Sequence, residues 1–565
     1  MYNEPKHKQW GGQDLKRNNI WQKIGAGALV LLAAVLAIRS LYGFCWSDES
    51  FYLTFAQRLW NGQKLILDEW HPVQFYSVIF YPVLSAYRAV KGTEGIYLFA
   101  RFFYLLLALG VSELVFFTFS KEAGTVASFL CAASVLAYSR GNIWGLSYYN
   151  LFLLLVLTAL CLAVRGRGKG LLNVLAGVCL GFSVLCVPYF AIFVVPALIW
   201  GLLKRETRVQ ALWMALGIAL SAAYFLLLFL PKDLGAVVGS LKTILSDPEH
   251  SSGPAANFVA AVEDVRLIYL RDMLLSCFCA ALLWAARKWL PGKTWAEIPA
   301  LFLVCLGALY SFWRCRKGET GFAAYSFCIY ALALFRWDDS QKLDLLLRRV
   351  GAAMAAAMAM SSNTEAIGFT VGLCVYAMGL ILPLSRAQKR SRRVVLVLAC
   401  LMVGITFCSR VTAVFRDGPL DTLTENLEAG PAAGIRTTAE SKEQYHQVLD
   451  MIQDLEEKYG SKNPVFFTRL LPWGYLACDF PCGAPTAWRT ELNSPRLEDY
   501  YESHPDSIPT IVVVLNPEIG RNPDPNMAAP NENTLEGWLW DYMQAHSYTE
   551  IRYSCARVYV SPDAV

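Results

Sequence analysis

The sequence predicts an α-helical polytopic membrane protein with a small α/β domain at its C-terminus. Hydrophobic residues make up 55% of the chain and charged residues 17%, whereas soluble domains contain roughly 45–50% and 25%. The apolar excess is concentrated in long runs between residues 24 and 415. Residues 416–565 have the mixed composition of a soluble domain.

About thirteen apolar runs are predicted to cross the membrane, because an apolar helix of about 20 residues spans a bilayer. They cover residues 24–44, 95–119, 122–139, 144–164, 170–187, 189–203, 209–230, 272–289, 296–312, 320–336, 347–362, 365–385 and 393–411. Residues 1–23 are polar and basic, and the run after them is long enough to span. The first run is therefore predicted to be a retained anchor, not a cleaved signal peptide.

The distribution of Lys and Arg predicts the orientation, because these residues collect in cytoplasmic loops. A cytoplasmic N-terminus places four basic loops inside: 165–169, 204–208, 287–288 and 386–393. The basic segment 314–317 falls outside, so either the span count is wrong nearby or those charges have an external role. The loops 45–94 and 231–271 and the C-terminal domain are predicted to be extracellular or periplasmic, at a plasma membrane.

A short helix is predicted over residues 47–62, directly after the first span. Its polar residues fall on one helical face and its apolar residues on another: Ser50, Thr54, Gln57 and Asn61 against Tyr52, Phe55 and Leu59. This pattern is typical of a helix that lies in the membrane interface.

Asp48 and Glu49 stand in the first turn of this predicted helix. One interpretation is structural: Ser47 caps the helix, and the two acids complement the positive end of its dipole. The other interpretation is chemical, since a carboxylate at the membrane surface can act as a general base.

Three motifs resemble those of membrane-embedded glycosyltransferases with the GT-C fold, in the group of protein mannosyltransferases and aminoarabinose transferases (glycosyltransferase family 39-like). They are the Asp48-Glu49 pair after the first span, the segment EWHPVQFY at 69–76, and GIYLFAR at 95–101. The resemblance covers about residues 24–205. Each motif is short, and their order and spacing within the predicted topology carry the resemblance.

The resemblance implies an inverting transfer of a sugar from a polyprenyl-phosphate carrier to an acceptor hydroxyl at the outer face. It implies Asp48 as the general base and Glu49 as a supporting carboxylate. The implied partners are a polyprenyl-phosphate-linked sugar donor, a glycan, lipid or protein acceptor of the cell envelope, and membrane lipid. No nucleic-acid partner is expected.

A cation is needed to stabilise the departing lipid phosphate. Arg101 matches a family position in the third motif; the other substrate-binding candidates are His71, Arg271, Arg314, Arg316 and Lys317. The alternative is that these cations only reach toward lipid headgroups. Many relatives have a Lys before Pro or Gly between the fifth and sixth spans, where this chain has CVPY at 186–189.

Metal dependence is left open, since some relatives use a divalent ion. Asp68, Glu69 and His71 could supply ligands, and a solvated loop explains them equally well. No metal ligand is assigned.

Residues 416–565 are predicted to form a small α/β domain with a partly parallel sheet. Helices are expected at 441–459 and 533–546, and strands at 464–468, 510–515, 550–553 and 556–560. Its aromatic residues could stack on sugars or form the core: Trp473, Tyr475, Trp488 and Trp538. Cys478 and Cys482 are either a disulfide or unpaired thiols.

Two other functions remain open from the sequence. A transporter or flippase for lipid-linked saccharides would be expected to carry its polar residues in broken helices at mid-membrane. A non-catalytic envelope-polymer assembly protein could keep the same scaffold, because fold does not fix function.

Overall fold

The structure is a computed structural model that describes residues 12–138, 140–245, 253–314, 323–334, 342–361, 365–385, 389–468, 471–488, 491–520 and 535–564. Within these ranges, eight helical segments are long and apolar enough to cross a membrane. They are built on α1 (Gly12–Arg39), α4 (Ile96–Ala123), α6 (Tyr148–Arg165), α9 (Arg208–Leu228), α11 (Gly253–Trp289), α12 (Ile298–Arg314), α16 (Thr370–Ile381) and α17 (Lys389–Thr412).

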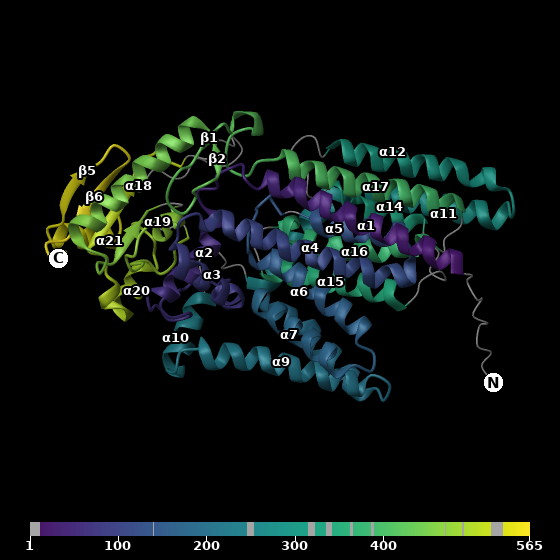
Figure 1. Ribbon diagram of the computed structural model, residues 1–565, viewed down its shortest axis with the longest axis horizontal. Coiled ribbons are helices and arrows are strands. Elements are labelled where there is room, and N and C mark those ends of the chain that lie inside the picture. The colour runs from purple at the N-terminus through teal and green to yellow at the C-terminus, as the bar shows by residue number, and fades with distance from the viewer. Residues whose placement is uncertain are drawn as a thin grey trace.

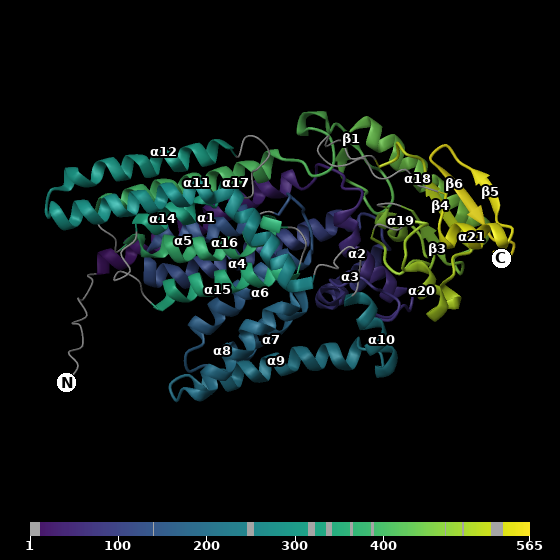
Figure 2. The ribbon, with the colours of Figure 1, turned by 180° about the vertical axis from the view of Figure 1, so that it is seen from behind.

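Five further helices of the described ranges complete the bundle, with axes roughly along its length (Figures 1 and 2). They are α5 (Thr125–Ala137), α7 (Gly170–Cys186), α8 (Ala191–Leu203), α14 (Ser326–Leu334) and α15 (Lys342–Ser361). Each of the thirteen predicted spans overlaps a helix, so the predicted multi-span helical fold is confirmed. One further helix, α10 (Leu234–Leu245), lies in the predicted external loop 231–271.

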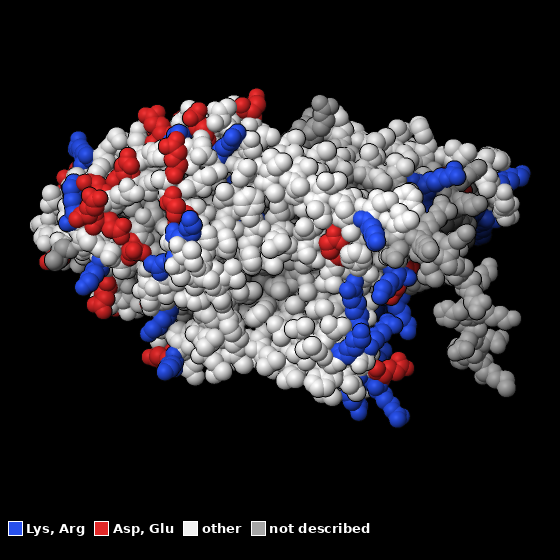
Figure 3. All heavy atoms as spheres, viewed as in Figure 1, with Lys and Arg blue, Asp and Glu red and all other residues white. Residues whose placement is uncertain are grey.

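The bundle is apolar on its outside as well as in its core. Large side chains such as Leu31, Leu203, Leu227 and Trp289 are each more than two-thirds exposed. A soluble protein would rarely expose so much contiguous apolar surface, and Figure 3 shows the middle of the molecule almost without charge. This belt is the surface that faces lipid.

Small residues let neighbouring helices approach closely, as is common in membrane bundles. A Cβ atom on Gly177 of α7 would lie 2.1 Å from the Met214 carbonyl oxygen of α9, and one on Gly217 would lie 2.0 Å from that of Val174. The α7–α9 contact therefore requires glycine at both positions.

The loop 45–94 folds between the bundle and the C-terminal domain (Figures 1 and 2). It contains α2 (Asp48–Trp60), η1 (Gln74–Tyr76) and α3 (Ser77–Lys91). The predicted helix over residues 47–62 is present as α2, and its position in the membrane interface stays a prediction. Residues 49–58 are buried because the bundle packs on one side of α2 and the C-terminal domain on another.

The C-terminal domain is the predicted small α/β unit. Its sheet runs β3 (Val465–Phe467), β4 (Ile511–Leu515), β6 (Ala556–Val560), β5 (Thr549–Arg552). The β3–β4 pair is parallel and the other two pairs are antiparallel, so the prediction of a partly parallel sheet is confirmed. The helices include α18 (Ala439–Tyr459), α19 (Pro472–Leu476), α20 (Leu497–Ser503) and α21 (Trp538–Ala545).

Backbone hydrogen bonds fasten this domain to the segment after α1. The Gly43 amide donates to the Arg436 carbonyl at 2.8 Å, and the Arg436 amide donates to that of Leu41 at 2.7 Å. The Trp70 amide donates to the Pro485 carbonyl at 2.7 Å. The C-terminal domain therefore covers α2.

Candidate active site beneath the C-terminal domain

Asp48 begins α2 at the point where the chain turns away from the end of α1. Its Oδ2 atom lies 2.6 Å from Nη1 of Arg416 and accepts a hydrogen bond from Ser47 Oγ at 2.9 Å. Its side chain keeps 17% of its surface exposed. No residue that the structure describes donates to Oδ1, so this oxygen is available to accept a proton.

Glu49 is held on the opposite side by Arg101 of α4. The pair is bidentate, with Nε to Oε1 and Nη2 to Oε2 both at 2.6 Å. Arg101 also donates to the carbonyls of Ser40 and Gly43, each at 2.7 Å. Both side chains are buried. Arg101 therefore joins three segments and is engaged by Glu49 and two carbonyls, not directed at an open site.

Two non-glycine residues near Asp48 have a left-handed backbone. Arg416 has φ of +54° and Asn142 has φ of +57°. A side chain pays about 1–2 kcal/mol for this conformation, although Asn tolerates it better. Such strain persists where the surroundings fix it, and it clusters at functional sites. Arg416 is held there by its contacts with Asp48 and Ser47.

The segment 140–147 between α5 and α6 packs against the end of α17. The Asn142 Nδ2 atom donates to the carbonyls of Arg410, at 3.2 Å, and Ala413. Ser147 caps α6 by accepting from the Asn150 amide at 3.3 Å. These bonds bring the short polar turn after α5 beside the residues that follow α17.

Arg140 leads this turn and lies among tyrosines. Its Nη1 atom donates to the Tyr148 hydroxyl at 2.9 Å, and its guanidinium lies 4.5 Å from the centroid of the Tyr149 ring. Tyr52 of α2 contacts Tyr149 at 6.0 Å between centroids. Burial raises the pKa of the Tyr52 phenol well above its ordinary value, so the hydroxyl stays protonated. The tyrosines therefore surround the Arg140 cation without adding negative charge.

Arg410 lies at the end of α17 with only 1% of its surface exposed. Its guanidinium lies 4.0 Å from the centroid of the Trp144 ring, and Nη1 donates to Asn142 Oδ1 at 3.4 Å. Three buried donors here have no acceptor in the described ranges: Arg410 Nε, Trp144 Nε1 and Arg416 Nε. Buried donors are nearly always paired, so these three donors leave hydrogen-bonding capacity that the described chain does not fill.

Positive charge exceeds negative charge in this region. The charged groups at this end of the bundle, each of which interacts with at least one neighbour in the region, are Arg39, Arg101, Arg140, Arg410 and Arg416 against Asp48, Glu49 and Asp417. The arginines outnumber the carboxylates by two. Burying unbalanced charge is unfavourable, so an anionic group would complement the region.

His71 packs against α2 through Phe51 and Phe55. Its ring contacts Phe51, one helical turn after Asp48, edge to face at 4.8 Å. Its Nδ1 atom accepts from the Val73 amide at 3.3 Å. The structure thus places this substrate-binding candidate in the packing of the loop 45–94.

Arg271 and Arg314 lie in a different cluster, formed by α11, α12 and α14. Arg271 stacks on Tyr310 at 4.0 Å. Arg314 Nη1 donates to the Ile268 carbonyl at 3.1 Å and lies 3.9 Å from Oδ2 of the buried Asp272. Arg316 and Lys317 lie outside the described residues.

No group of three or more His, Cys, Asp or Glu side chains converges on a metal-sized site within the described ranges. Glu69 lies 3.3 Å from Arg58, and both are buried. Burial raises the pKa of the Glu69 carboxyl, while Arg58 opposes the shift. Asp68 accepts from the Lys64 amide. These two carboxylates therefore serve the loop itself.

In the C-terminal domain, most of the aromatic residues and cysteines whose role the sequence does not decide belong to the hydrophobic core. Trp473 and Tyr475 are buried, and Trp473 stacks on Tyr445 of α18 at 4.5 Å. Cys478 and Cys482 are unpaired buried thiols. Trp488 and Trp538 are partly buried.

Sequence reasoning missed Arg140, Arg410 and Arg416. Arg410 falls inside the predicted span 393–411, and an ionisable residue inside a span is by itself a sign of function. Arg140 follows the predicted span 122–139 directly. Arg416 carries no such signal, because its role depends on the left-handed turn that follows α17.

No family model matches the chain, and no curated protein matches it. Among solved structures, the chain is similar to the oligosaccharyltransferase of Archaeoglobus fulgidus tethered to an acceptor peptide with an NVT sequon. The identity is 14% and the TM-score 0.38, over 86% of this chain and 69% of that one. At this TM-score the likeness carries no argument about activity.

Proposed function

We propose that the chain is an inverting glycosyltransferase of the cell envelope that uses a polyprenyl-phosphate-linked sugar. In the proposed reaction, the acceptor hydroxyl oxygen forms a bond to the anomeric carbon while the bond from that carbon to the phosphate oxygen breaks. The hydroxyl proton passes to Asp48, and the lipid phosphate leaves with the bonding electrons.

The choice of Asp48 over Glu49 is supported by their surroundings. Glu49 is buried, and Arg101 binds both of its oxygens. Asp48 is partly exposed and has one oxygen without a donor in the described part of the chain. A general base must reach the proton that it removes, and of the two acids Asp48 alone meets that condition.

The single observation that carries the proposal is a set of buried donors without acceptors in the two segments that pack together after α5 and α17, one of which holds Arg416, the partner of Asp48. Arg410 Nε, Trp144 Nε1 and Arg416 Nε are buried without acceptors in the described ranges. A departing phosphate supplies acceptor oxygens and negative charge, and preorganised donors stabilise such charge strongly. The expected roles are therefore Arg410 and Arg416 as phosphate-binding residues, in place of the family lysine that this chain lacks.

The proposed orientation puts this site on the outer face. Figure 3 shows Lys and Arg gathered over the loops that join α6 to α7 and α8 to α9, at the end of the bundle away from the C-terminal domain. Positive charge marks the cytoplasmic end. The site and the C-terminal domain that covers it then face the extracytoplasmic side, where relatives of the proposed group act.

The test compares sugar transfer by the wild-type protein and by Asp48→Asn, both reconstituted in lipid with polyprenyl-phosphate sugars and an envelope extract. Loss of a general base lowers rates by about 10²–10⁴-fold. Asp421→Asn is the matched control, because Asp421 is an exposed acid after α17. Equal transfer by wild type and Asp48→Asn would remove Asp48 as the base. Movement of a lipid-linked saccharide across the bilayer without transfer would favour a flippase.

A further inference from the structure

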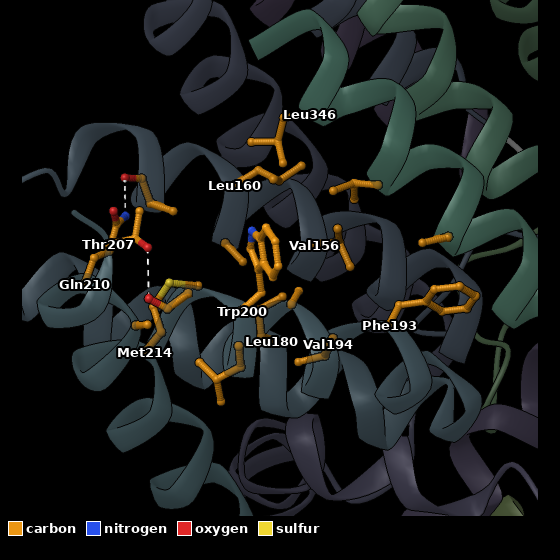
Figure 4. A pocket seen from close by; sticks show the side chains of 18 of the residues that line it. Val156, Leu160, Leu180, Phe193, Val194, Trp200, Thr207, Gln210, Met214 and Leu346 are labelled. Atoms are coloured by element: carbon orange, nitrogen blue, oxygen red, sulfur yellow. Dashed lines mark hydrogen bonds between the residues drawn. The ribbon is translucent and has the colours of Figure 1, made fainter. Parts of the chain in front are cut away.

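A second site lies in the bundle, between α6, α8, α9 and α15. It is a cavity of about 670 Å³, within the range of about 300–1,000 Å³ that is usual for small-molecule sites. Figure 4 shows the Trp200 side chain among Val156, Leu160 and Leu346. Most of the other lining residues are also apolar.

Polar side chains line the cavity near the end of α8 and in the first turns of α9 and α15. They are Lys204, Thr207, Gln210 and Arg349. Thr207 Oγ1 donates to the Gly201 carbonyl at 2.9 Å, and Gln210 Nε2 donates to the Ala163 carbonyl at 3.0 Å. Figure 4 shows the Thr207 and Gln210 side chains. Thr207 and Gln210 thus bond within the protein, whereas Lys204 and Arg349 form no ion pair with the residues that the structure describes.

The cavity opens toward the lipid-facing surface. Trp200 lines it and is 62% exposed. Lys204 Nζ lies 4.7 Å from the centroid of the Trp200 ring, so the cation sits at the mouth of an apolar space. Only an amphiphile complements such a site, with its chain against the apolar wall and an anionic head beside the cations.

We propose that this groove binds an anionic phospholipid from the leaflet at the basic end of the bundle, with its phosphate between Lys204 and Arg349. Lipid binding here does not require glycosyltransferase activity. The choice of a phospholipid over the sugar donor rests on the proposed function, which assigns the donor phosphate to the opposite end, beside Asp48. A lipid held here would support α8, which contacts its neighbours less extensively than the central helices do.

The test measures lipids retained by the purified full-length protein in native mass spectrometry. The delipidated protein is incubated with equal amounts of phosphatidylglycerol and phosphatidylcholine that carry the same acyl chains. A Lys or Arg near the surface adds about 1 kcal/mol to the binding of an anionic lipid. Two cations therefore predict a preference of roughly thirtyfold for phosphatidylglycerol.

The double variant Lys204→Gln/Arg349→Gln is expected to abolish this preference and leave phosphatidylcholine retention unchanged. The control is Arg167→Gln/Arg205→Gln, which removes two exposed cations from the same end that do not line the cavity. Ala353→Phe, which fills the cavity, is expected to reduce retention of both lipids. Equal retention of the two lipids by the wild type would overturn the proposal, as would an equal effect of the control pair. Displacement of phosphatidylglycerol by polyprenyl phosphate at equal concentration would assign the groove to the donor instead and overturn it too.

Discussion

Glu49 and Arg101 form a buried bidentate ion pair in which both nitrogen–oxygen distances are 2.6 Å. The remaining bonds of Arg101, to the carbonyls of Ser40 and Gly43, tie the end of α1 to α2 and α4. Asp48 is the adjacent residue, yet it faces Arg416 and stays partly exposed. The two neighbouring acids thus have different environments. That of Glu49 suits an acid that stabilises the fold, and that of Asp48 suits a general base.

Glu49→Gln should destabilise the protein far more than Asp48→Asn. Removing one partner of a buried ion pair costs about 3–5 kcal/mol, since the other charge is left unpaired. The Asp48–Arg416 pair is less buried, with 17% and 13% of the two side-chain surfaces exposed, so breaking it should cost less. The measurement is the thermal unfolding midpoint of each variant in detergent. Similar midpoints for the two variants would show that Glu49 is not the anchoring acid.

Arg416→Gly should separate stability from activity. The substitution removes the partner of Asp48 and relieves a left-handed backbone that costs about 1–2 kcal/mol for a side chain. The loss of the pair and the gain from the backbone oppose each other, so the unfolding midpoint should change little. Sugar transfer should fall at least tenfold, because the variant lacks one phosphate donor and the Asp48 partner. Arg436→Gly, at an arginine whose side chain contacts Tyr42, is the control for activity.

Arg410→Met should leave stability unchanged or raise it, and should weaken use of the donor. No carboxylate lies within ion-pair distance of Arg410 in the described ranges, and the buried charge is costly to keep. The apparent KM for the polyprenyl-phosphate sugar should rise at least tenfold. Arg410→Lys keeps the charge but loses the Nε donor, so it should give an intermediate KM. An unchanged KM with a lowered unfolding midpoint would make Arg410 a structural residue.

Periodicity and hydropathy were sufficient to predict the helical fold. Apolar runs identify spans because the bilayer requires about 20 apolar residues per helix. The strand at β4 was also visible, since Ile511–Leu515 is an apolar run and is buried throughout. What the pattern could not show is burial by another domain. The polar face of α2 resembles an interfacial helix, but Gln57 Nε2 donates to the Cys478 carbonyl at 2.9 Å, and Asn61 Nδ2 to that of Phe480 at 3.0 Å.

The candidate site was only partly visible in the sequence. Asp48, Glu49 and Arg101 stand out in the sequence, and the structure pairs Arg101 with Glu49, the residue next to Asp48. The sequence does not predict what Arg101 binds, because its match to a family position does not show which acceptors surround its side chain in this protein. Arg140 and Arg416 belong to turns whose meeting depends on tertiary packing between segments more than 250 residues apart in sequence. Such long-range contacts leave no local pattern.

The C-terminal domain that covers the site provides a last prediction, because two arginines join this domain to the loop 45–94 in different ways. Arg58 is buried, lies 3.3 Å from Glu69, and donates to the Ala484 carbonyl at 3.0 Å. Arg88 makes an exposed pair with Asp479 at 2.8 Å. Arg58→Met leaves Glu69 buried without its partner, which costs about 3–5 kcal/mol, whereas Arg88→Met should cost at most about 1 kcal/mol. Limited thermolysin digestion should therefore cut Arg58→Met faster between α17 and α18, and cut Arg88→Met at the wild-type rate. Equal rates for all three proteins would mean that Arg58 does not hold the domain in place over Asp48.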